Sequence, residues 1–139
     1  MVSIDVVKLL REDLTVTWTN KKTLTEFNPP LAVERLVYEV RPEAYERWKA
    51  VEFEMWTKGE ADRFPFFLGK ETWLQKTDDV YRVTVIIYWQ SLEEWRAIDP
   101  EWLDQHEAAF AAAVGAENVT LVYANFEHGE QYYKISEYR

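Results

Sequence analysis

Residues 83–89, VTVIIYW, form a stretch that is apolar at almost every position. Its β-branched and aromatic residues favour a β-strand. In an antiparallel sheet with one face in water, apolar and polar residues alternate along each strand, because successive side chains point to opposite faces. Here Val83 and Val85 point one way, and Ile86 and Tyr88 point the other. The chain therefore needs a fold in which this strand is covered on both faces.

A helix start follows this strand directly, without a glycine or a loop. Ser91 with Glu94 three residues later is a capping box, in which the two side chains satisfy backbone amides at a helix start. Asp99 with Pro100 is a second start, with Asp as the N-cap and Pro at the first helical position. The sequence thus predicts a helical region that begins at Ser91, kinks or restarts at Asp99 and ends at Gly115.

The remaining elements define the fold class. Four strands are predicted, over residues 33–40, 67–75, 80–90 and 118–128. A first amphipathic helix opens at Pro42 and is predicted to end at Gly59. The order β-α-β-β-α-β predicts an α+β fold of the ferredoxin-like type, with a four-stranded antiparallel sheet and two helices on one of its faces.

The chain is predicted to divide into an N-terminal extension over residues 1–30, a ferredoxin-like α+β barrel domain over residues 31–129 and a C-terminal tail over residues 130–139. The extension is predicted to hold a short helix over residues 4–11 and a hairpin that turns at residues 20–22. Asn28-Pro29-Pro30 is expected to end regular structure there. A domain of this length buries a substantial core without disulfides or metals.

The second face of the sheet needs a cover. The predicted fourth strand is also apolar on both faces, with Val119 and Leu121 opposite Val122 and Phe126. A contiguous apolar patch of this size is rare on a monomer, and no remaining segment is long enough to form a second layer. The sequence therefore predicts a homodimer through the sheet face, with the N-terminal hairpin as a competing, partial cover.

Composition excludes several classes of protein. The absence of cysteine rules out a disulfide framework and thiol catalysis, and it suits a reducing cytoplasm. With 25 acidic and 16 basic residues the formal charge is −9, so binding to nucleic acid or to an anionic membrane surface is not expected. No apolar run approaches the roughly 20 residues that cross a bilayer. We therefore predict a cytoplasmic protein whose many aromatic side chains, 16% of the chain, fill a core or line a pocket.

His106 is the main candidate for chemistry. It continues an apolar stripe on the second predicted helix, which directs the ring toward the sheet. In a buried pocket an imidazole can act as a general base. The alternative is a core histidine hydrogen-bonded to a buried carbonyl or hydroxyl group. Glu52 is a second catalytic candidate, as a carboxylate of raised pKa, and a solvated edge position is its alternative.

Five further residues are predicted to line a ligand pocket. They are the rings of Trp73, Tyr88, Trp89 and Trp102, and the amide of Asn125. Ordinary packing is the alternative for each of them. The sequence offers no set of side chains with the number and spacing of a metal site, and no phosphate-binding loop or nucleotide fingerprint. We therefore predict no metal and no cofactor, with a small hydrophobic molecule as the ligand.

A strand that ends Tyr88-Trp89-Gln90 and passes directly into Ser91-Leu92-Glu93-Glu94-Trp95 resembles the dimeric α+β barrel superfamily, which includes the antibiotic-biosynthesis-monooxygenase-like proteins. The run from Val33 to Gly115, with WRAIDPEWL and HEAAFAAAVG, is similar to a small uncharacterised family of cyanobacterial proteins in that superfamily. The resemblance covers about residues 33–127. It implies two sheets that face each other as a barrel, with a pocket between sheet and helices in each subunit. Haem-degrading members use an Asn, Trp and His constellation, which a first strand without Asn and the late position of His106 do not reproduce.

Two functions follow from these patterns. The first is a monooxygenase-like enzyme that acts on a small hydrophobic or aromatic metabolite, in which His106 transfers a proton with help from Glu52 or Asn125. The alternative is a non-catalytic homodimer that binds a ligand or a protein partner. The lack of a strong catalytic constellation and the acidic composition favour this alternative.

Overall fold

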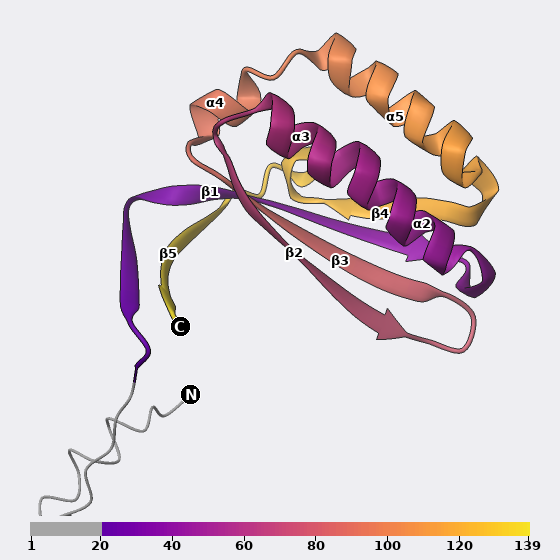
Figure 1. Ribbon diagram of the computed structural model, residues 1–139, viewed down its shortest axis with the longest axis horizontal. Helices are drawn as coiled ribbons and strands as arrows, with labels where there is room; N and C mark the ends of the chain where they lie inside the picture. Colours follow the sequence, from indigo (N-terminus) through magenta and orange to yellow (C-terminus); the bar gives the residue numbers. More distant parts are fainter. Residues whose placement is uncertain (1–20) are drawn as a thin grey trace, which may run out of the picture.

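The computed structural model describes residues 21–139 of the chain (Figure 1). The short helix predicted over residues 4–11 and the first arm of the predicted hairpin lie outside the described residues.

The described part of the chain contains five strands and two helical regions. The strands are β1 (Leu24–Val40), β2 (Phe67–Lys76), β3 (Tyr81–Trp89), β4 (Val119–Ala124) and β5 (Tyr132–Tyr138). The first helical region joins the 3-10 turn η1 (Pro42–Ala44), α2 (Tyr45–Glu52), the π-helical segment η2 (Phe53–Thr57) and α3 (Lys58–Arg63). The second region comprises α4 (Leu92–Arg96) and α5 (Pro100–Val114), and two short 3-10 turns flank β4, η3 (Ala116–Asn118) and η4 (Asn125–His128).

These elements form an α+β fold around an antiparallel sheet, which confirms the predicted α+β class, and the sheet has five strands where four were predicted. The strand order is β2-β3-β1-β4, and β5 pairs with the N-terminal part of β1. Both helical regions lie on one face of the sheet (Figure 1). The fifth strand comes from the segment predicted to be a tail, where polar and aromatic residues pair with a β1 that begins earlier than predicted.

The first strand runs through the segment that was expected to end regular structure. Asn28-Pro29-Pro30 lies inside β1, and the Asn28-Pro29 peptide bond is cis. Pairing with β5 loses its register between Glu26 and Leu31, because proline has no N–H to donate to a ladder. The N-terminal half of β1 and β5 form a two-stranded arm that extends away from the helices (Figure 1).

The first helical region continues past its predicted end at Gly59 and stops at Arg63. Gly59 lies inside α3, and the ring of His106 packs against it. A Cβ atom added at Gly59 would lie 3.5 Å from the ring atoms of His106 on α5. That distance is an ordinary van der Waals contact, so this glycine faces α5 from within the helix and does not end it.

The predicted starts of the second helical region are confirmed. The hydroxyl of Ser91 accepts a hydrogen bond from the backbone N–H of Glu94 at 3.1 Å. The carboxylate of Asp99 accepts one from the N–H of Glu101 at 3.0 Å, and Pro100 opens α5. Gly115, with a φ of 93°, ends α5 as predicted.

The core lies between the sheet and the helices. Val83, Val85, Ile87 and Trp89 on β3 are buried on the helix-covered face. Tyr88 lies on the opposite, open face, where it is partly buried. No helix among residues 21–139 is long and apolar enough to cross a membrane. The two aromatic residues that end β3 therefore belong to different layers of the molecule.

Candidate functional site

A cavity of about 720 Å³ lies between the sheet and the two helical regions. Its walls include Tyr38 from β1, Ile87 from β3, Trp56 from η2 and Trp95 from α4. Its rim includes the exposed ring of Phe126, so the cavity opens to solvent near η4. Cavities of roughly 300–1,000 Å³ with such walls are typical of small-molecule sites.

The sheet register brings two charged side chains into this cavity. Glu34 on β1 pairs with Ile87 on β3, and Ile87 pairs on its other side with Lys70 on β2. Directly opposed residues of neighbouring strands point to the same face of the sheet. Glu34 and Lys70 therefore lie in one row with the buried Ile87, on the face that the helices cover.

Glu34 is held in place by a fully buried tryptophan. The indole Nε1–H of Trp89 donates a hydrogen bond to Oε1 of Glu34 at 3.1 Å. Trp89 itself stacks on Trp95, with ring centroids 6.3 Å apart. Burial raises the pKa of Glu34 to about 7, although the Trp89 hydrogen bond and the charge of Lys70 lower it. Glu34 can thus gain or lose a proton near neutral pH.

Glu60 on α3 is the second carboxyl group of the cavity. It is only 4% exposed, and its side chain has no hydrogen-bond partner among residues 21–139. Burial raises the pKa of Glu60 to about 9, and the negative charge of Glu34 raises it further. At neutral pH the Glu34–Glu60 pair therefore keeps at least one proton. The indole N–H of Trp56 is also fully buried without a partner in the described part of the chain.

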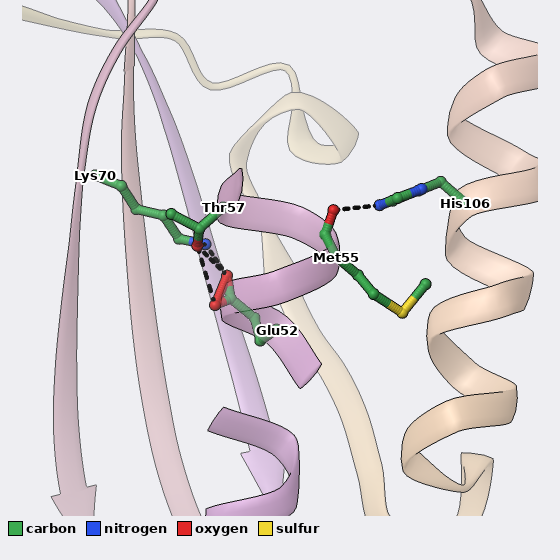
Figure 2. Close-up of polar contacts among 5 residues, drawn as sticks. All are labelled: Glu52, Met55, Thr57, Lys70 and His106. Atoms are coloured by element: carbon green, nitrogen blue, oxygen red, sulfur yellow. Dashed lines mark hydrogen bonds and ion pairs between the residues drawn. The ribbon is translucent and has the colours of Figure 1, made fainter. Parts of the chain in front are cut away.

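Lys70 is tied to the first helical region (Figure 2). It forms an ion pair with Glu52 and donates a hydrogen bond to Oγ1 of Thr57 at 2.6 Å. The Thr57 hydroxyl donates to Glu52 in turn, at 3.2 Å to Oε1. Burial lowers the pKa of Lys70 to about 7, while the charge of Glu34 raises it. The sheet and the helix are thus joined by a buried polar contact beside the cavity.

The π-helical turn explains why Thr57 reaches Glu52. The backbone N–H of Lys58 bonds to the carbonyl of Phe53, five residues earlier. This wider turn brings residues five apart onto the same side of the helix, as Glu52 and Thr57 are. Single π-helical turns inside α-helices are frequent at functional sites.

His106 lies between the helices and does not line the cavity. Its Nε2 atom is 2.5 Å from the carbonyl oxygen of Met55, so this nitrogen carries a proton and donates it (Figure 2). The ring stacks on Trp102, with centroids 4.6 Å apart, and meets Trp56 edge-on at 4.5 Å. The ring is packed among aromatic side chains and bonded to a backbone carbonyl, with His106 and Met55 both partly buried. Trp102 is part of the same packing and also lies outside the cavity wall.

The other predicted residues are divided among three places. Glu52 lines the cavity as the partner of Lys70, and Trp89 lies in the core behind the lining, where it donates to Glu34. Tyr88 is on the open face of the sheet, where its hydroxyl donates to Glu71 at 2.8 Å. Trp73 is on that face too and is 64% exposed. The predicted aromatic set is therefore not brought together at one site.

Asn125 is fully buried, and its amide is occupied by the backbone. Its Oδ1 atom accepts from the N–H of Arg35 at 2.8 Å, and its Nδ2 atom donates to the carbonyls of Val33 and Glu130 at 3.1 and 2.8 Å. These bonds fasten η4 to β1, next to the rim of the cavity. Asn125 thus holds the backbone of η4 in place at the entrance of the cavity.

Sequence reasoning missed Glu34, Glu60 and Lys70. Glu34 could have been found, because it occupies an inward position of β1 in the same alternation as Leu36 and Tyr38. A charged residue in such a position is unusual unless it is paired or functional. The inward position of Lys70 follows a register shift between Phe67 and Gly69, which no sequence pattern announces.

Among residues 21–139, no group of three or more acidic or histidine side chains is arranged to hold a metal ion. Comparisons with protein families, with curated proteins and with solved structures found no match for this chain. Its class is therefore defined by fold and site alone. It is an α+β protein with an internal cavity that has aromatic walls and a buried pair of carboxyl groups.

Proposed function

We propose that the protein is an enzyme that transfers a proton to or from a small hydrophobic or aromatic metabolite bound in the sheet–helix cavity. The observation that carries this proposal is the Glu34–Glu60 pair, enclosed in a cavity of about 720 Å³ with tryptophan walls. Carboxyl groups with raised pKa values in a cleft are typical of general acid–base sites.

Glu34 is the proton acceptor in this mechanism. A general base is most effective when its pKa lies near the working pH, and burial places the pKa of Glu34 at about 7. The hydrogen bond from Trp89 fixes the position of the carboxylate. Glu60 has no hydrogen-bond partner within the described residues, so its carboxyl group can bind the polar group of the substrate.

Lys70 acts as a positioning residue. Its ion pair with Glu52 and its bond to Thr57 anchor it, and its positive charge lowers the pKa of Glu34. A substrate that loses a proton to Glu34 becomes electron-rich. The site therefore suits isomerisation, which needs proton transfer alone, and it is compatible with the monooxygenase-like chemistry that the family resemblance implies.

Proton transfer can be tested by hydrogen–deuterium exchange. A panel of small aromatic ketones, such as phenylacetone, is incubated with the protein in D₂O, and loss of the acidic C–H signal is followed by NMR. We expect acceleration by the wild type and a fall of at least ~100-fold for Glu34→Gln, because a positioned general base contributes about that factor. Glu54→Gln makes the same substitution at an exposed position of the first helical region, so it is the matched control and should exchange at the wild-type rate.

Two outcomes would contradict the proposal that the protein is a proton-transfer enzyme with Glu34 as its base. Equal exchange by the wild type and Glu34→Gln would remove Glu34 as the base. Binding of the panel with no exchange at all would favour the alternative, a non-catalytic ligand-binding protein.

We further propose that the domain is ferredoxin-like and forms a homodimer through the open face of the sheet. The strand order β2-β3-β1-β4, with helices on one face, supports the ferredoxin-like unit. On the open face Trp73 is 64% exposed, next to the partly buried Thr84 and Ile86 of β3. A second copy would cover these side chains, as in a barrel made of two sheets.

Light scattering coupled to gel filtration tests this assembly. The expected mass is twice the 16.6 kDa of one chain, and Trp73→Arg should shift it toward one chain. Phe53→Arg is a control, because Phe53 is exposed on the helical side of the molecule. A wild-type mass of one chain at high concentration would exclude the dimer.

A further inference from the structure

The lining of the cavity is rich in carboxyl groups. Among residues 21–139, seven carboxyl side chains line it together with two basic ones, Lys70 and Arg96. Lys70 is already paired with Glu52. Six carboxyl groups and one guanidinium group therefore remain to meet a ligand, which disfavours an anionic one.

Glu60 is the residue that we expect to bind a positively charged group of the ligand. Its carboxyl group faces the cavity, is 96% buried and has no hydrogen-bond partner in the described chain. A buried carboxyl group without a partner lowers the stability of the fold unless a ligand supplies the missing hydrogen bond or charge. Glu34 lines the same cavity, and its charge acts on Glu60, so a cation bound beside Glu60 would also be attracted by Glu34.

The walls of the cavity suit an organic cation with a hydrophobic body. Trp56 and Trp95 line it together with Tyr38, and aromatic faces attract organic cations as well as apolar groups. The exposed carboxyl groups of Asp104 and Glu127 lie at the lining nearer the surface. They would draw a cation toward the entrance.

From these features we propose that the ligand is a hydrophobic amine, whose ammonium group is bound by Glu60 and whose apolar body lies between Trp56 and Trp95. This inference rests on the proposed function, since it assumes that the cavity is a small-molecule site. An ammonium group beside Glu60 stabilises its ionised form, which provides the missing partner for the carboxyl group. Glu34 remains next to the bound molecule as the proton acceptor.

Three probes that share a phenylpropyl group and differ in the charge of their end group test whether charge or shape decides the affinity. They are 3-phenylpropylamine, 3-phenylpropanol and 3-phenylpropanoate, titrated into the full chain and followed by calorimetry and tryptophan fluorescence. We expect the amine to bind at least tenfold more tightly than the alcohol, and the carboxylate to bind most weakly. Glu60→Gln should lose the preference for the amine and keep the affinity for the alcohol.

Glu54→Gln is the matched control, because it removes one negative charge from the exposed side of the same helical region. It should leave all three affinities unchanged, and circular dichroism checks that each variant is folded. Equal or tighter binding of the alcohol or the carboxylate would overturn the amine inference and leave the cavity as a small-molecule site. Binding of none of the probes would overturn the proposed function together with the inference.

Discussion

The two sides of the first helical region offer a direct comparison. Toward α5, the carbonyl of Met55 is bonded to His106, whose ring lies on Gly59 and between two tryptophans. Toward the sheet, Glu60 has no partner among residues 21–139, and it shares the cavity with Glu34. Both sides are built from aromatic rings and polar groups within a few residues of each other. They differ in one ionisable group on each side: His106 is bonded to a backbone carbonyl, whereas Glu60 has no partner in the described part of the chain.

This difference separates packing from function. A buried polar group with a good partner contributes modestly to stability and fixes the geometry of its neighbours. A buried carboxyl without one lowers stability, and natural proteins retain such a group where a ligand needs it. For this reason we propose the sheet side as the functional site and a structural role for the α5 side.

The largest effect is expected from breaking the polar contact on the sheet side. Lys70→Met leaves Glu52 buried without its cation, and the side chains of the pair are only 7% and 9% exposed. We expect the free energy of unfolding to fall by about 3–5 kcal/mol, the usual cost of removing one partner of a buried ion pair. Urea denaturation monitored by circular dichroism measures it.

A double variant shows whether charge is the cause. Glu52→Leu combined with Lys70→Met removes both charges and should recover most of the lost stability, because a hydrophobic pair often replaces a buried ion pair without cost. If the double variant is less stable than Lys70→Met alone, the contact stabilises through its shape and not through its charge balance.

The second prediction concerns pH. Burial raises the pKa values of Glu34 and Glu60 to about 7 and about 9, so the folded state binds these protons more tightly than the unfolded chain, whose pKa is 4.5. Their contribution to stability is fully present below pH 4.5 and is lost as the pH rises through 7 and 9. The lowered pKa of Lys70 acts in the opposite sense above pH 7. Stability should therefore fall from pH 5 to 7 and level off from pH 7 to 9.

Glu60→Gln should make this pH profile shallower. Each proton taken up on folding contributes a slope of about 1.4 kcal/mol per pH unit, so removing one of two carboxyl groups should halve the slope between pH 5 and 7. Thermal denaturation at each pH gives the profile. An identical slope in the variant would show that Glu60 does not hold a proton in this range.

The third prediction turns to the α5 side. His106→Phe keeps a ring between the tryptophans and leaves the carbonyl of Met55 without its donor. We expect a loss of about 1–3 kcal/mol in stability, typical of an orphaned buried acceptor. Affinity for 3-phenylpropylamine and the exchange rate of phenylacetone should not change. A large loss of affinity or of exchange rate with unchanged stability would show that His106 takes part in binding or catalysis.

The sequence predicted the local structure wherever the chemistry was local. The capping box at Ser91, the Asp99-Pro100 start and the glycine end at Gly115 each depend on a few neighbouring residues, and all three appear in the structure. The missed strand β5 depends on pairing with β1, which is distant in sequence. Local patterns carry no information about such a partner.

The candidate site was harder to predict for the same reason. His106 was singled out because a lone histidine on an apolar stripe is conspicuous, yet its bond to Met55 joins two helices 51 residues apart. Glu34 and Lys70 are inconspicuous in sequence, and only the register through Ile87 aligns them. Inward-facing charges on a strand would have been the better guide, since burial makes them costly.

The smallest effect is expected at Gly59, and it tests how closely the helices pack on the α5 side. A Cβ atom there would lie 3.5 Å from the His106 ring, which is an ordinary contact. Alanine is favoured over glycine inside a helix by about 0.5–1 kcal/mol, so Gly59→Ala should raise stability by about that amount. Probe affinity should stay the same, because the new methyl group points toward α5. A loss of more than ~1 kcal/mol would mean that the helices tolerate no added atom, and the α5 side would then be as constrained as the cavity.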